Sequence, residues 1–411
     1  MNIFNSICTG ISELLHLVLY WLACTIPKHP NTWSVGAWYG KTYNDNSKYL
    51  FEYVSHYEKH INIAWITKDK KVKAYIRSKG YRAYLTYEPF GIFHMLTSSI
   101  ALFVQTKEHD LSGSCIGPKT KLVQLWHGFS FKKYLGTNPI RMPFQMKVHP
   151  LVEKSILSLA LVFLHKKYNS LNDLPYRNEY WEEYHLICAK SARHKQKFLD
   201  IVPTIKPEKI VVAEYPRTDG LLDTHYSSPF VHKIEKLKAE GARIGIFMPT
   251  FRSSGCSVPD VYLPGIEKFS KYLEKNNIHI FVKLHSNDAS SFIENCVQYK
   301  AFHLISNNDI HWDIYPVLSH TDFLLTDYSS IYSDYALLDK PIIFTPFDKD
   351  EYQKFRGLYS DYDRLTEGKS AVNWNQVEQL LAQIKPNNTK IMPENITSYS
   401  KEMFSIITGT L

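Results

Sequence analysis

Residues 323–346 read FLLTDYSSIYSDYALLDKPIIFTP, and this stretch decides the fold that the sequence predicts. The apolar runs at 323–325 and 342–344 are typical of buried strands. Between them lie a polar turn at 326–330 and a stretch with the spacing of a helix, so the whole predicts a β–α–β unit. Unpaired backbone N–H groups and the helix dipole favour an anion at the start of such a helix. The turn is therefore a candidate site for the diphosphate of an activated nucleotide donor.

The same alternation of apolar runs and helical spacing extends over most of the chain. A charged passage at residues 226–240 separates two series of expected strands, at 34–40, 61–67, 81–85, 100–105, 121–125, 184–189 and 210–213, and then at 243–248, 278–284, 301–305, 323–325 and 342–344. Strands that alternate with helices indicate parallel sheets covered on both faces. Because 411 residues exceed one ordinary core, we expect an α/β fold of two similar halves facing across a cleft, with a helix at 1–30 and halves at 31–230 and 231–411.

The composition narrows the class of protein. Hydrophobic residues make up 44% of the chain and charged residues 21%, which is typical of a folded globular protein. The net charge of +8 suits phosphate-rich substrates or an anionic membrane surface, but it is equally compatible with no such role. The positive charge is scattered and no recognised motif accompanies it, so nucleic acid is not an expected partner. The six cysteines show no metal-ligand spacing, which favours reduced thiols in the cytoplasm.

The apolar segment at residues 7–26 has two readings. It lacks a basic leading region and a cleavage site, so a signal peptide is not expected, and Ser12, Glu13 and His16 leave too short an apolar run for a membrane span. It is either an amphipathic helix on a membrane, anchored by Trp21 and Lys28, or a helix packed on its own domain. Residues 142–166 mix basic and apolar side chains and form a second candidate surface, for which packing within the domain is slightly favoured.

Polar side chains follow five of the expected strands. Ligands of parallel sheets bind beyond the carboxyl ends of the strands, where these side chains gather. His127 follows the strand at 121–125 and precedes Gly128, which favours an accessible imidazole for acid–base work, although a hydrogen-bonded core histidine remains the alternative. The other strand-end groups are Arg217, Thr250 with Arg252, Lys283 with His285, and Ser329 with Ser330.

The order and spacing of these groups resemble the CDP-glycerol glycerophosphotransferase family, bacterial enzymes that build poly(glycerol phosphate) teichoic acids and capsular polymers. The matching pieces are WHG at 126–128, YPR-D at 215–219, PTFR at 249–252, KLH at 283–285, and TDYSS at 326–330 with Asp334 and the following FRGLY at 355–359. The resemblance extends from about residue 33 to about residue 363. It implies a GT-B fold of two Rossmann-like domains, with the acceptor on the first and CDP-glycerol on the second.

The resemblance also implies roles for individual residues. His127 would be the base that deprotonates the acceptor hydroxyl, and His285 would bind the diphosphate or protonate the leaving CMP. Arg217 and Lys283 would neutralise phosphate charge, and Asp334 would contact the glycerol or order the site. The remaining donor-site residues are Gly128, Phe129, Ser130, Thr250, Phe251, Arg252, Ser329 and Ser330. Phosphoryl transfer depends mainly on positioning and on cations and N–H donors around the developing charge, which this set supplies.

Two departures from the family pattern leave the donor open. Phe129 and Ser130 replace the usual Thr-Pro, and residues 283–286 read KLHS where the family has Arg-x-His-Pro. A lysine cannot form the two-pronged contact of an arginine with phosphate. A GT-B transferase that uses CDP-ribitol or a nucleotide sugar is the alternative, and a non-catalytic scaffold of a polymer-export complex is another. The acidic pattern at 348–350 reads as a solvated loop rather than a metal site.

The expected setting follows from the same resemblance. The partners are CDP-glycerol, a lipid-linked or oligosaccharide acceptor and an anionic membrane surface, and a homo-oligomer is left open. No cofactor and no metal are expected, because GT-B enzymes generally work without a bound metal. The expected location is the cytoplasm, with peripheral attachment to the inner face of the cell membrane.

Overall fold

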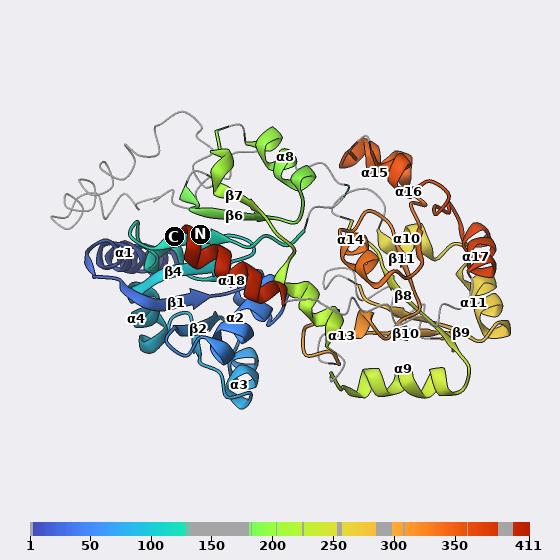
Figure 1. Ribbon diagram of the computed structural model, residues 1–411, viewed down its shortest axis with the longest axis horizontal. Helices are drawn as coiled ribbons and strands as arrows, with labels where there is room; N and C mark the ends of the chain where they lie inside the picture. Colours follow the sequence, from blue (N-terminus) through green and yellow to red (C-terminus); the bar gives the residue numbers. More distant parts are fainter. Residues whose placement is uncertain are drawn as a thin grey trace.

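Two parallel sheets organise the chain, one in each half (Figure 1). The computed structural model describes residues 3–128, 131, 181, 183–202, 204–223, 226–252, 257–284, 298–306, 309–359, 361–384 and 398–411. The strands of the first sheet are β1 (His29–Val35), β2 (Asn62–Thr67), β3 (Ala83–Leu85), β4 (Ser98–Phe103), β5 (Lys121–Gln124), β6 (Leu186–Ala189) and β7 (Ile210–Val212). Those of the second sheet are β8 (Arg243–Met248), β9 (Ile278–Val282), β10 (Phe302–Leu304), β11 (Phe323–Thr326) and β12 (Ile342–Phe344).

Both sheets have the same winding. The first runs in the order β3-β2-β1-β4-β5-β6-β7 and the second in the order β10-β9-β8-β11-β12. In each, the chain lays strands outward on one side of the first strand and then returns to its other side, so that the order reverses between β1 and β4 and between β8 and β11. Ligands of such sheets bind at this reversal, beyond the carboxyl ends of the strands.

Strand β11 shows why both faces of the second sheet are covered. Successive side chains of a strand point to opposite faces. Phe323 and Leu325 belong to a core cluster with α10 (Val258–Tyr262), α11 (Ile266–Lys275) and α17 (Trp374–Gln383), whereas Leu324 belongs to a cluster with α9 (Pro229–Ala239), α13 (Tyr315–Leu318) and α14 (Ile331–Tyr335). The continuous apolar run at 323–325 is therefore a strand buried on both faces. The helices α15 (Lys349–Phe355) and α16 (Tyr362–Thr366) and the turn η5 (Ala336–Leu338) complete this half.

Helices of the first half begin at residues that the sequence suits to helix starts. Asp69 accepts hydrogen bonds from the backbone N–H groups of Lys71 and Val72 at the start of α3, and Ser191 accepts one from His194 at the start of α8. The elements that surround this sheet are α1 (Ile3–Thr25), α2 (Asp45–Tyr57), α3 (Lys70–Ser78), α4 (Pro89–Thr97), α5 (Lys107–Asp110), α8 (Ala192–Ile201), and the 3₁₀ turns η1 (Trp38–Gly40), η2 (Gly113–Cys115), η3 (Pro207–Lys209) and η4 (Pro216–Leu222).

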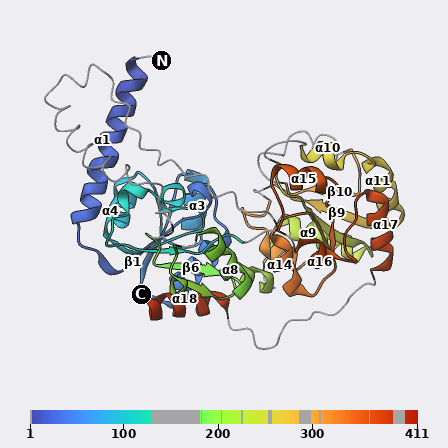
Figure 2. The same ribbon diagram turned by 90° about the horizontal axis from the view of Figure 1, so that it is seen from above.

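The last helix, α18 (Tyr399–Thr410), returns to the first half (Figures 1 and 2). Its Met403 and Ile407 are buried in the same core as β1 and β4. Asp219 of the YPR-D motif accepts hydrogen bonds from the backbone N–H of Tyr399 at 2.8 Å and from that of Ser400 at 3.0 Å. The division of the chain at residues 30 and 230 remains a proposal. Residues 399–410 of α18 pack with the first half, although they follow the second half in the sequence.

Helix α1 packs on the first half through part of its surface. Leu19 and Ala23 are buried in the core of that half. Figure 2 shows the earlier turns of α1 extending away from the rest of the first half. None of the helices in the described ranges is long and apolar enough to cross a membrane.

Several predicted boundaries are wrong, for identifiable reasons. The first strand is His29–Val35 rather than 34–40, because Tyr39 and Gly40 take positive φ values of 61° and 68° and form η1. The predicted helix at 261–275 is two helices, divided at Gly265, whose φ is 81°. The charged passage between the halves contains a full helix, α9, which begins at the capping Ser228.

Candidate active site

His127 lies in the turn that follows β5, at the carboxyl edge of the first sheet. Its Nδ1 atom lies 2.9 Å from the carbonyl oxygen of Val104, which follows the neighbouring β4. A carbonyl oxygen only accepts hydrogen bonds, so Nδ1 donates, and Nε2 of the neutral ring keeps its lone pair. The rings of Trp38 and Trp126 lie 5.3 Å and 4.9 Å from the imidazole, measured between ring centroids. The tautomer of His127 with its proton on Nδ1 is the one that a general base acting through Nε2 needs.

The turn that carries His127 is fixed by Asn46 of α2. The Asn46 Nδ2 atom donates to the carbonyl oxygens of Leu125 and Trp126, at 3.0 and 2.8 Å. Trp126 has a φ of 58°, a conformation that is rare for a bulky residue and must be held by its surroundings. The Oδ1 atom of Asn46 accepts from the backbone N–H of Arg217 at 3.2 Å. One buried amide therefore ties the His127 turn to the segment that carries Arg217.

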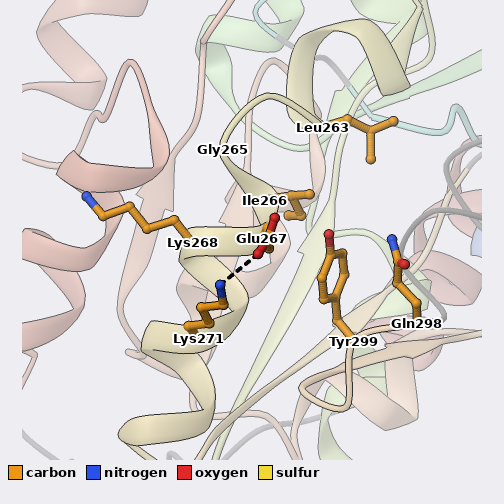
Figure 3. A pocket seen from close by; sticks show the side chains of 8 residues that line it. All are labelled: Leu263, Gly265, Ile266, Glu267, Lys268, Lys271, Gln298 and Tyr299. Carbon is orange, nitrogen blue, oxygen red and sulfur yellow. Dashed lines mark hydrogen bonds and ion pairs between the residues drawn. The ribbon is translucent and has the colours of Figure 1, made fainter.

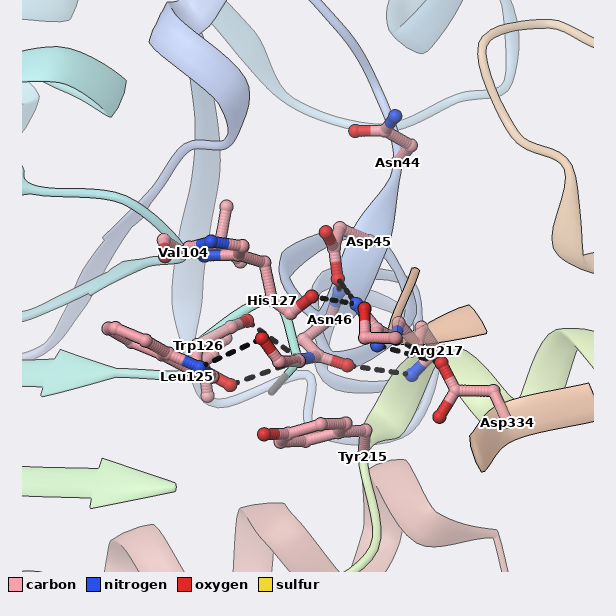
Figure 4. Close-up of polar contacts among 12 residues, drawn as sticks. Asn44, Asp45, Asn46, Val104, Leu125, Trp126, His127, Tyr215, Arg217 and Asp334 are labelled. Atoms are coloured by element: carbon pink, nitrogen blue, oxygen red, sulfur yellow. Dashed lines mark hydrogen bonds and ion pairs between the residues drawn. The ribbon is translucent and has the colours of Figure 1, made fainter. Parts of the chain in front are cut away.

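The buried guanidinium of Arg217, in η4, joins the two halves (Figure 4). Its Nη1 donates to Asp45 Oδ1 at 2.9 Å and to the carbonyl oxygen of His127 at 2.8 Å, both in the first half. Its Nε and Nη2 donate to Oδ2 of Asp334 in α14 of the second half, at 3.1 and 2.7 Å. Two residues predicted to contact the donor are thus paired with each other.

Asp334 is fully buried and surrounded by donors. The Lys190 Nζ atom lies 2.7 Å from its Oδ1, and the Tyr315 hydroxyl donates to its Oδ2 at 2.6 Å. Burial alone would raise the pKa of Asp334, but the charges of Arg217 and Lys190 outweigh burial and lower the pKa to about 2. Lys190 also pairs with Glu214 at 3.1 Å. Asp334 is therefore an ionised anchor at the junction between the halves.

Gly128 allows the turn of the second half to approach the first half beside His127. Its φ is 102°, and a Cβ atom at this position would lie 2.8 Å from Arg217 Nη2 and 2.8 Å from Ser330 Oγ. Ser330 belongs to the polar turn at 326–330. The structure thus brings Gly128, Arg217, Ser330 and Asp334 together beside the His127 turn, while their roles toward a substrate remain predictions.

A second buried cluster forms around Asp327 of the polar turn at 326–330. Asp327 accepts hydrogen bonds from the backbone N–H of Thr250 at 2.9 Å and from the Tyr262 hydroxyl at 3.0 Å. Arg252 Nη1 lies 2.9 Å from Asp327 Oδ2. Burial alone would raise the pKa of Asp327, but Arg252 and the hydrogen bonds from Thr250 lower it below its usual range. Asp327 therefore links the end of β8 to the end of β11, at the reversal of the second sheet.

Arg252 is held on its other side by Asp348, which corrects the prediction of a solvated loop at 348–350. The Arg252 Nε and Nη2 atoms lie 2.7 and 2.9 Å from the two carboxylate oxygens of Asp348, whose side chain is only 7% exposed. The rings of Tyr328 and Tyr352 flank the guanidinium at 5.2 and 4.9 Å. Within the described ranges, no group of three or more His, Cys, Asp or Glu side chains is arranged to hold a metal ion.

Lys283 and His285 differ in what the structure shows of them. Lys283 follows β9, and burial lowers its pKa. Its Nζ donates to the carbonyl oxygen of Leu284 at 3.1 Å, and the described part of the chain offers it no ion pair. His285, Phe129 and Ser130 lie outside the described residues. The partly buried ammonium group of Lys283 suits an anionic ligand.

The turn at Ser329 and Ser330 precedes a shorter helix than the sequence predicts. Helix α14 has five residues before it tightens into η5. The dipole contribution of so short a helix is small, so side-chain hydroxyls and neighbouring cations have to supply most of the attraction for a phosphate. Ser329 Oγ accepts from the backbone N–H of Ile331 at 3.4 Å.

A pocket of about 580 Å³ lies elsewhere in the second half, beside α11 (Figure 3). It is lined by Leu263, Gly265, Ile266, Glu267, Lys268, Lys271, Gln298 and Tyr299. Its charged side chains Glu267 and Lys271 pair with each other at 2.7 Å and are exposed. None of the predicted site residues lines this pocket.

Sequence reasoning missed several residues of the two clusters, namely Asp45, Asn46, Lys190, Tyr315, Asp327 and Asp348. Lys190 and Asp327 follow β6 and β11 directly, so the strand-end rule that selected His127 applies to them as well. Asp45 and Asn46 carry no such signal, because they lie in the first turn of α2 and their partners are far away in the sequence.

Comparison with known proteins places these sites in a family. The family model described as CDP-glycerol:poly(glycerophosphate) glycerophosphotransferase matches residues 18–409. The teichoic acid glycerol-phosphate transferase of Staphylococcus aureus is 22% identical over 405 residues, which cover 95% of this chain and 94% of that protein. The ribitol-phosphate polymerase TarL of the same organism is 29% identical over 196 residues, or 46% of this chain. The chain spans only 34% of TarL.

A solved structure of the wall teichoic acid polymerase TagF supports the fold. The form soaked with CDPG has a TM-score of 0.62 and 18% sequence identity, and the match covers 99% of this chain and 91% of that chain. At 18% sequence identity the match supports only the fold, which is GT-B-like.

Proposed function

The chain belongs to the CDP-glycerol:poly(glycerophosphate) glycerophosphotransferase family, and we propose that it transfers glycerol phosphate from CDP-glycerol to a hydroxyl of a lipid-linked or saccharide acceptor. CMP is released, and the product is teichoic acid or a related capsular polymer. One observation carries the proposal. The His127 ring, held with its proton on Nδ1, precedes the glycine that Ser330 of the other half approaches. The candidate base His127 and the candidate phosphate-binding turn at 326–330 thus lie close together where the two halves meet.

In the proposed reaction the acceptor oxygen attacks the β-phosphorus of CDP-glycerol. The new bond joins that oxygen to the β-phosphorus, and the bond between the β-phosphorus and the bridging oxygen of CMP breaks. The acceptor proton passes to His127 Nε2. Ser329, Ser330 and Lys283 bind phosphate oxygens, and His285 protonates the leaving CMP. Such groups act by positioning and by neutralising charge that develops in the transition state.

Arg217 and Asp334 act in this proposal as a pair that positions the site. Arg217 already donates to two carboxylates, so it supports phosphate binding by fixing the approach of α14 and Ser330 to Gly128. Asp334 orders the site in the same way. Arg252 holds the turn through Asp327 while Thr250 and Phe251 lie toward the donor.

The proposed setting assigns the acceptor to residues 31–230 and the donor to residues 231–411, facing across a cleft. A lipid-linked acceptor is held at a membrane, so we place the protein in the cytoplasm, peripherally attached to the inner face of the cell membrane. An anionic membrane surface is its expected partner, and the net charge of +8 supports this.

CDP-ribitol is the second candidate donor, because TarL is a ribitol-phosphate polymerase and is 29% identical over the matched segment. The test is to incubate the purified protein with CDP-glycerol, CDP-ribitol or UDP-sugars, each with a lipid-linked acceptor, and to measure CMP and UDP. CMP release with CDP-glycerol is expected. Release with CDP-ribitol alone contradicts the first proposal and supports the second.

His127→Ala tests the base directly. Loss of a general base costs about 10²–10⁴-fold in rate, so CMP release is expected to fall by that factor while the melting temperature stays near that of the parent protein. His60→Ala, at an exposed histidine of the same half, serves as the control and is expected to keep full activity. Full activity in His127→Ala contradicts the enzyme proposal and supports a non-catalytic scaffold.

A further inference from the structure

An exposed aromatic pair lies where the first sheet reverses its strand order, between β1 and β4. Ligands of such sheets bind beyond the carboxyl ends of the strands at this point. The element η1 follows β1 and carries Tyr39, and α5 follows β4 and carries His109. The ring centroids of Tyr39 and His109 lie 5.0 Å apart, and we call the two rings the Tyr39–His109 pair. Both side chains are exposed, that of Tyr39 to 46%.

The backbone that carries Tyr39 is strained. Trp38, Tyr39 and Gly40 have φ values of 43°, 61° and 68°, and only a glycine adopts such values without cost. Strained residues persist only where their surroundings hold them, and they gather at functional sites. The backbone favours a glycine at position 39, and the half-exposed ring contributes little to the core. The tyrosine ring therefore suits a contact outside the protein's own core.

Asp110 of α5 links the backbone of Tyr39 to the position of His127. Its Oδ1 atom accepts a hydrogen bond from the backbone N–H of Tyr39 at 2.8 Å, and its Oδ2 atom accepts one from the backbone N–H of Val104 at 2.9 Å. The carbonyl oxygen of the same Val104 holds the Nδ1 atom of His127 (Figure 4). One buried carboxylate thus fixes Tyr39 relative to the candidate base.

Trp38 makes a second link between η1 and the candidate active site. Its Nε1 atom donates to Asp45 Oδ2 at 2.8 Å, and the other oxygen of this carboxylate accepts from Arg217. The ring of Trp38 meets that of His127 edge to face, with the ring centroids 5.3 Å apart. Two separate links therefore hold the residue pair 38–39 beside the candidate base.

Lysines lie next to the Tyr39–His109 pair. The Lys68 Nζ atom donates to the carbonyl oxygen of His109 at 2.7 Å, and the exposed Lys41 follows η1. Neither lysine forms an ion pair with a described residue. Burial and the charge of Lys68 lower the pKa of His109, so its imidazole is neutral near pH 7. His109 thus offers an aromatic ring, while the positive charge comes from the two lysines.

We propose that the Tyr39–His109 pair binds a sugar ring of the acceptor, so that the acceptor hydroxyl reaches His127. The C–H groups of a sugar ring carry small positive charges and lie well against the negative face of an aromatic ring. The lysines accommodate a negatively charged group attached to the sugar. The inference rests on the proposed function and leaves the donor in the second half, because η1 and α5 follow strands of the first sheet. Stacking of the donor's cytosine on the same rings is the competing assignment.

Binding of a saccharide without any donor tests the subsite independently of the chemistry. Saturation-transfer NMR with N,N′-diacetylchitobiose is expected to show binding to the parent protein and equal binding to His127→Ala. Tyr39→Ala is expected to bind the disaccharide about tenfold more weakly, because it removes the stacked ring. Tyr39→Phe keeps the ring and is expected to bind like the parent. Tyr57→Ala changes an exposed tyrosine elsewhere in the same half and is the matched control.

Kinetics with CDP-glycerol and a lipid-linked acceptor distinguish the acceptor from the donor. Tyr39→Ala is expected to raise the KM for the acceptor about tenfold and to leave the KM for CDP-glycerol near that of the parent. The melting temperature is expected to stay near the parent value, because alanine keeps a Cβ atom on the same strained backbone. A rise in the KM for CDP-glycerol alone overturns the inference and assigns the rings to cytosine.

The binding measurement also separates this inference from the proposed function. Equal disaccharide binding by the parent and Tyr39→Ala overturns the inference, as does an absence of binding by the parent. Weakening in Tyr39→Phe as large as in Tyr39→Ala overturns the stacking role and assigns the contact to the hydroxyl. If no donor gives CMP release, the proposed function fails, whereas weaker disaccharide binding by Tyr39→Ala still supports the saccharide site.

Discussion

Gly128 is the residue at which backbone conformation and the approach of the two halves coincide. Its φ of 102° is strained for any residue with a Cβ, and the atom would also collide with Arg217 and Ser330. The position therefore needs a glycine for two independent reasons. Only the first can be anticipated from the sequence, where a glycine follows a histidine in a predicted turn.

Gly128→Ala separates the two reasons when it is compared with Gly80→Ala. Gly80 has a similar positive φ of 81°, but nothing lies within 4 Å of the Cβ that alanine would add. Gly80→Ala is expected to cost about 1–2 kcal/mol of unfolding free energy through backbone strain alone. Gly128→Ala is expected to cost more and to lower CMP release at least tenfold, measured by denaturant unfolding and by product assay.

Equal costs in the two alanine variants, with activity retained in Gly128→Ala, contradict the close approach of Ser330. Gly368→Ala provides a further control in the second half, because its positive φ of 71° is likewise accompanied by open space.

At the scale of elements, the turn at 326–330 is supported by the cluster of Asp327, Arg252 and Asp348. If Arg252 positions the turn, removing its outer carboxylate should harm donor binding even though Asp348 is itself negative and repels an anion. Asp348→Asn is therefore expected to raise the KM for CDP-glycerol severalfold and to lower the melting temperature, because it weakens a buried ion pair.

Asp350→Asn, two residues away and exposed, is the matched control and is expected to leave both quantities unchanged. If Arg252 instead binds the donor directly, Asp348→Asn frees the guanidinium and the KM falls. The sign of the change in KM thus distinguishes a positioning arginine from a ligand.

The elements themselves were predictable where local pattern decides structure. Strand β8 has the predicted bounds 243–248, and β11 begins at Phe323 as expected, because strands buried on both faces are short apolar runs with clear ends. The start of strand β1 was not predicted, because its first residues, His29 to Asn31, are exposed and not apolar.

The candidate site was predictable only in part. The strand-end rule found His127, Arg217 and Ser330, since position along a strand is local information. It did not reveal that Arg217 pairs with Asp334, 117 residues away, or that Asp348 packs against Arg252, 96 residues away. A carboxylate in a polar stretch looks solvated until the fold supplies its partner, and this is why the prediction for Asp348 was wrong.

At the scale of the whole molecule, the pair of Arg217 and Asp334 couples the two halves, and its strength depends on pH. The folded-state pKa of Asp334 is about 2, below the unfolded value of 3.8. A depressed carboxyl pKa stabilises the folded state fully above about pH 4, and this contribution disappears as the pH falls toward 2. The difference corresponds to about 2 kcal/mol at neutral pH.

Calorimetry between pH 5 and 2 checks this coupling. The melting temperature of the parent protein is expected to fall more steeply over that range than that of Asp334→Asn, which lacks the titrating group. The variant is expected to start lower because Arg217 and Lys190 lose one of their two carboxylate partners. Asp339→Asn, at an exposed aspartate of the same segment, is expected to keep the slope of the parent. Parallel curves for parent and Asp334→Asn contradict the assignment.

The return of α18 to the first half has a consequence for the order of events during synthesis. Because Met403 and Ile407 complete the core around β1 and β4, that core is unfinished while the ribosome makes the whole second half. The nascent first half keeps an apolar surface uncovered during this time, and such a surface is prone to misassembly. Asp219 also lacks two of its hydrogen-bond donors during this time, since they are the backbone N–H groups of residues 399 and 400. Translation of the second half therefore sets the earliest moment at which the first half reaches its final stability.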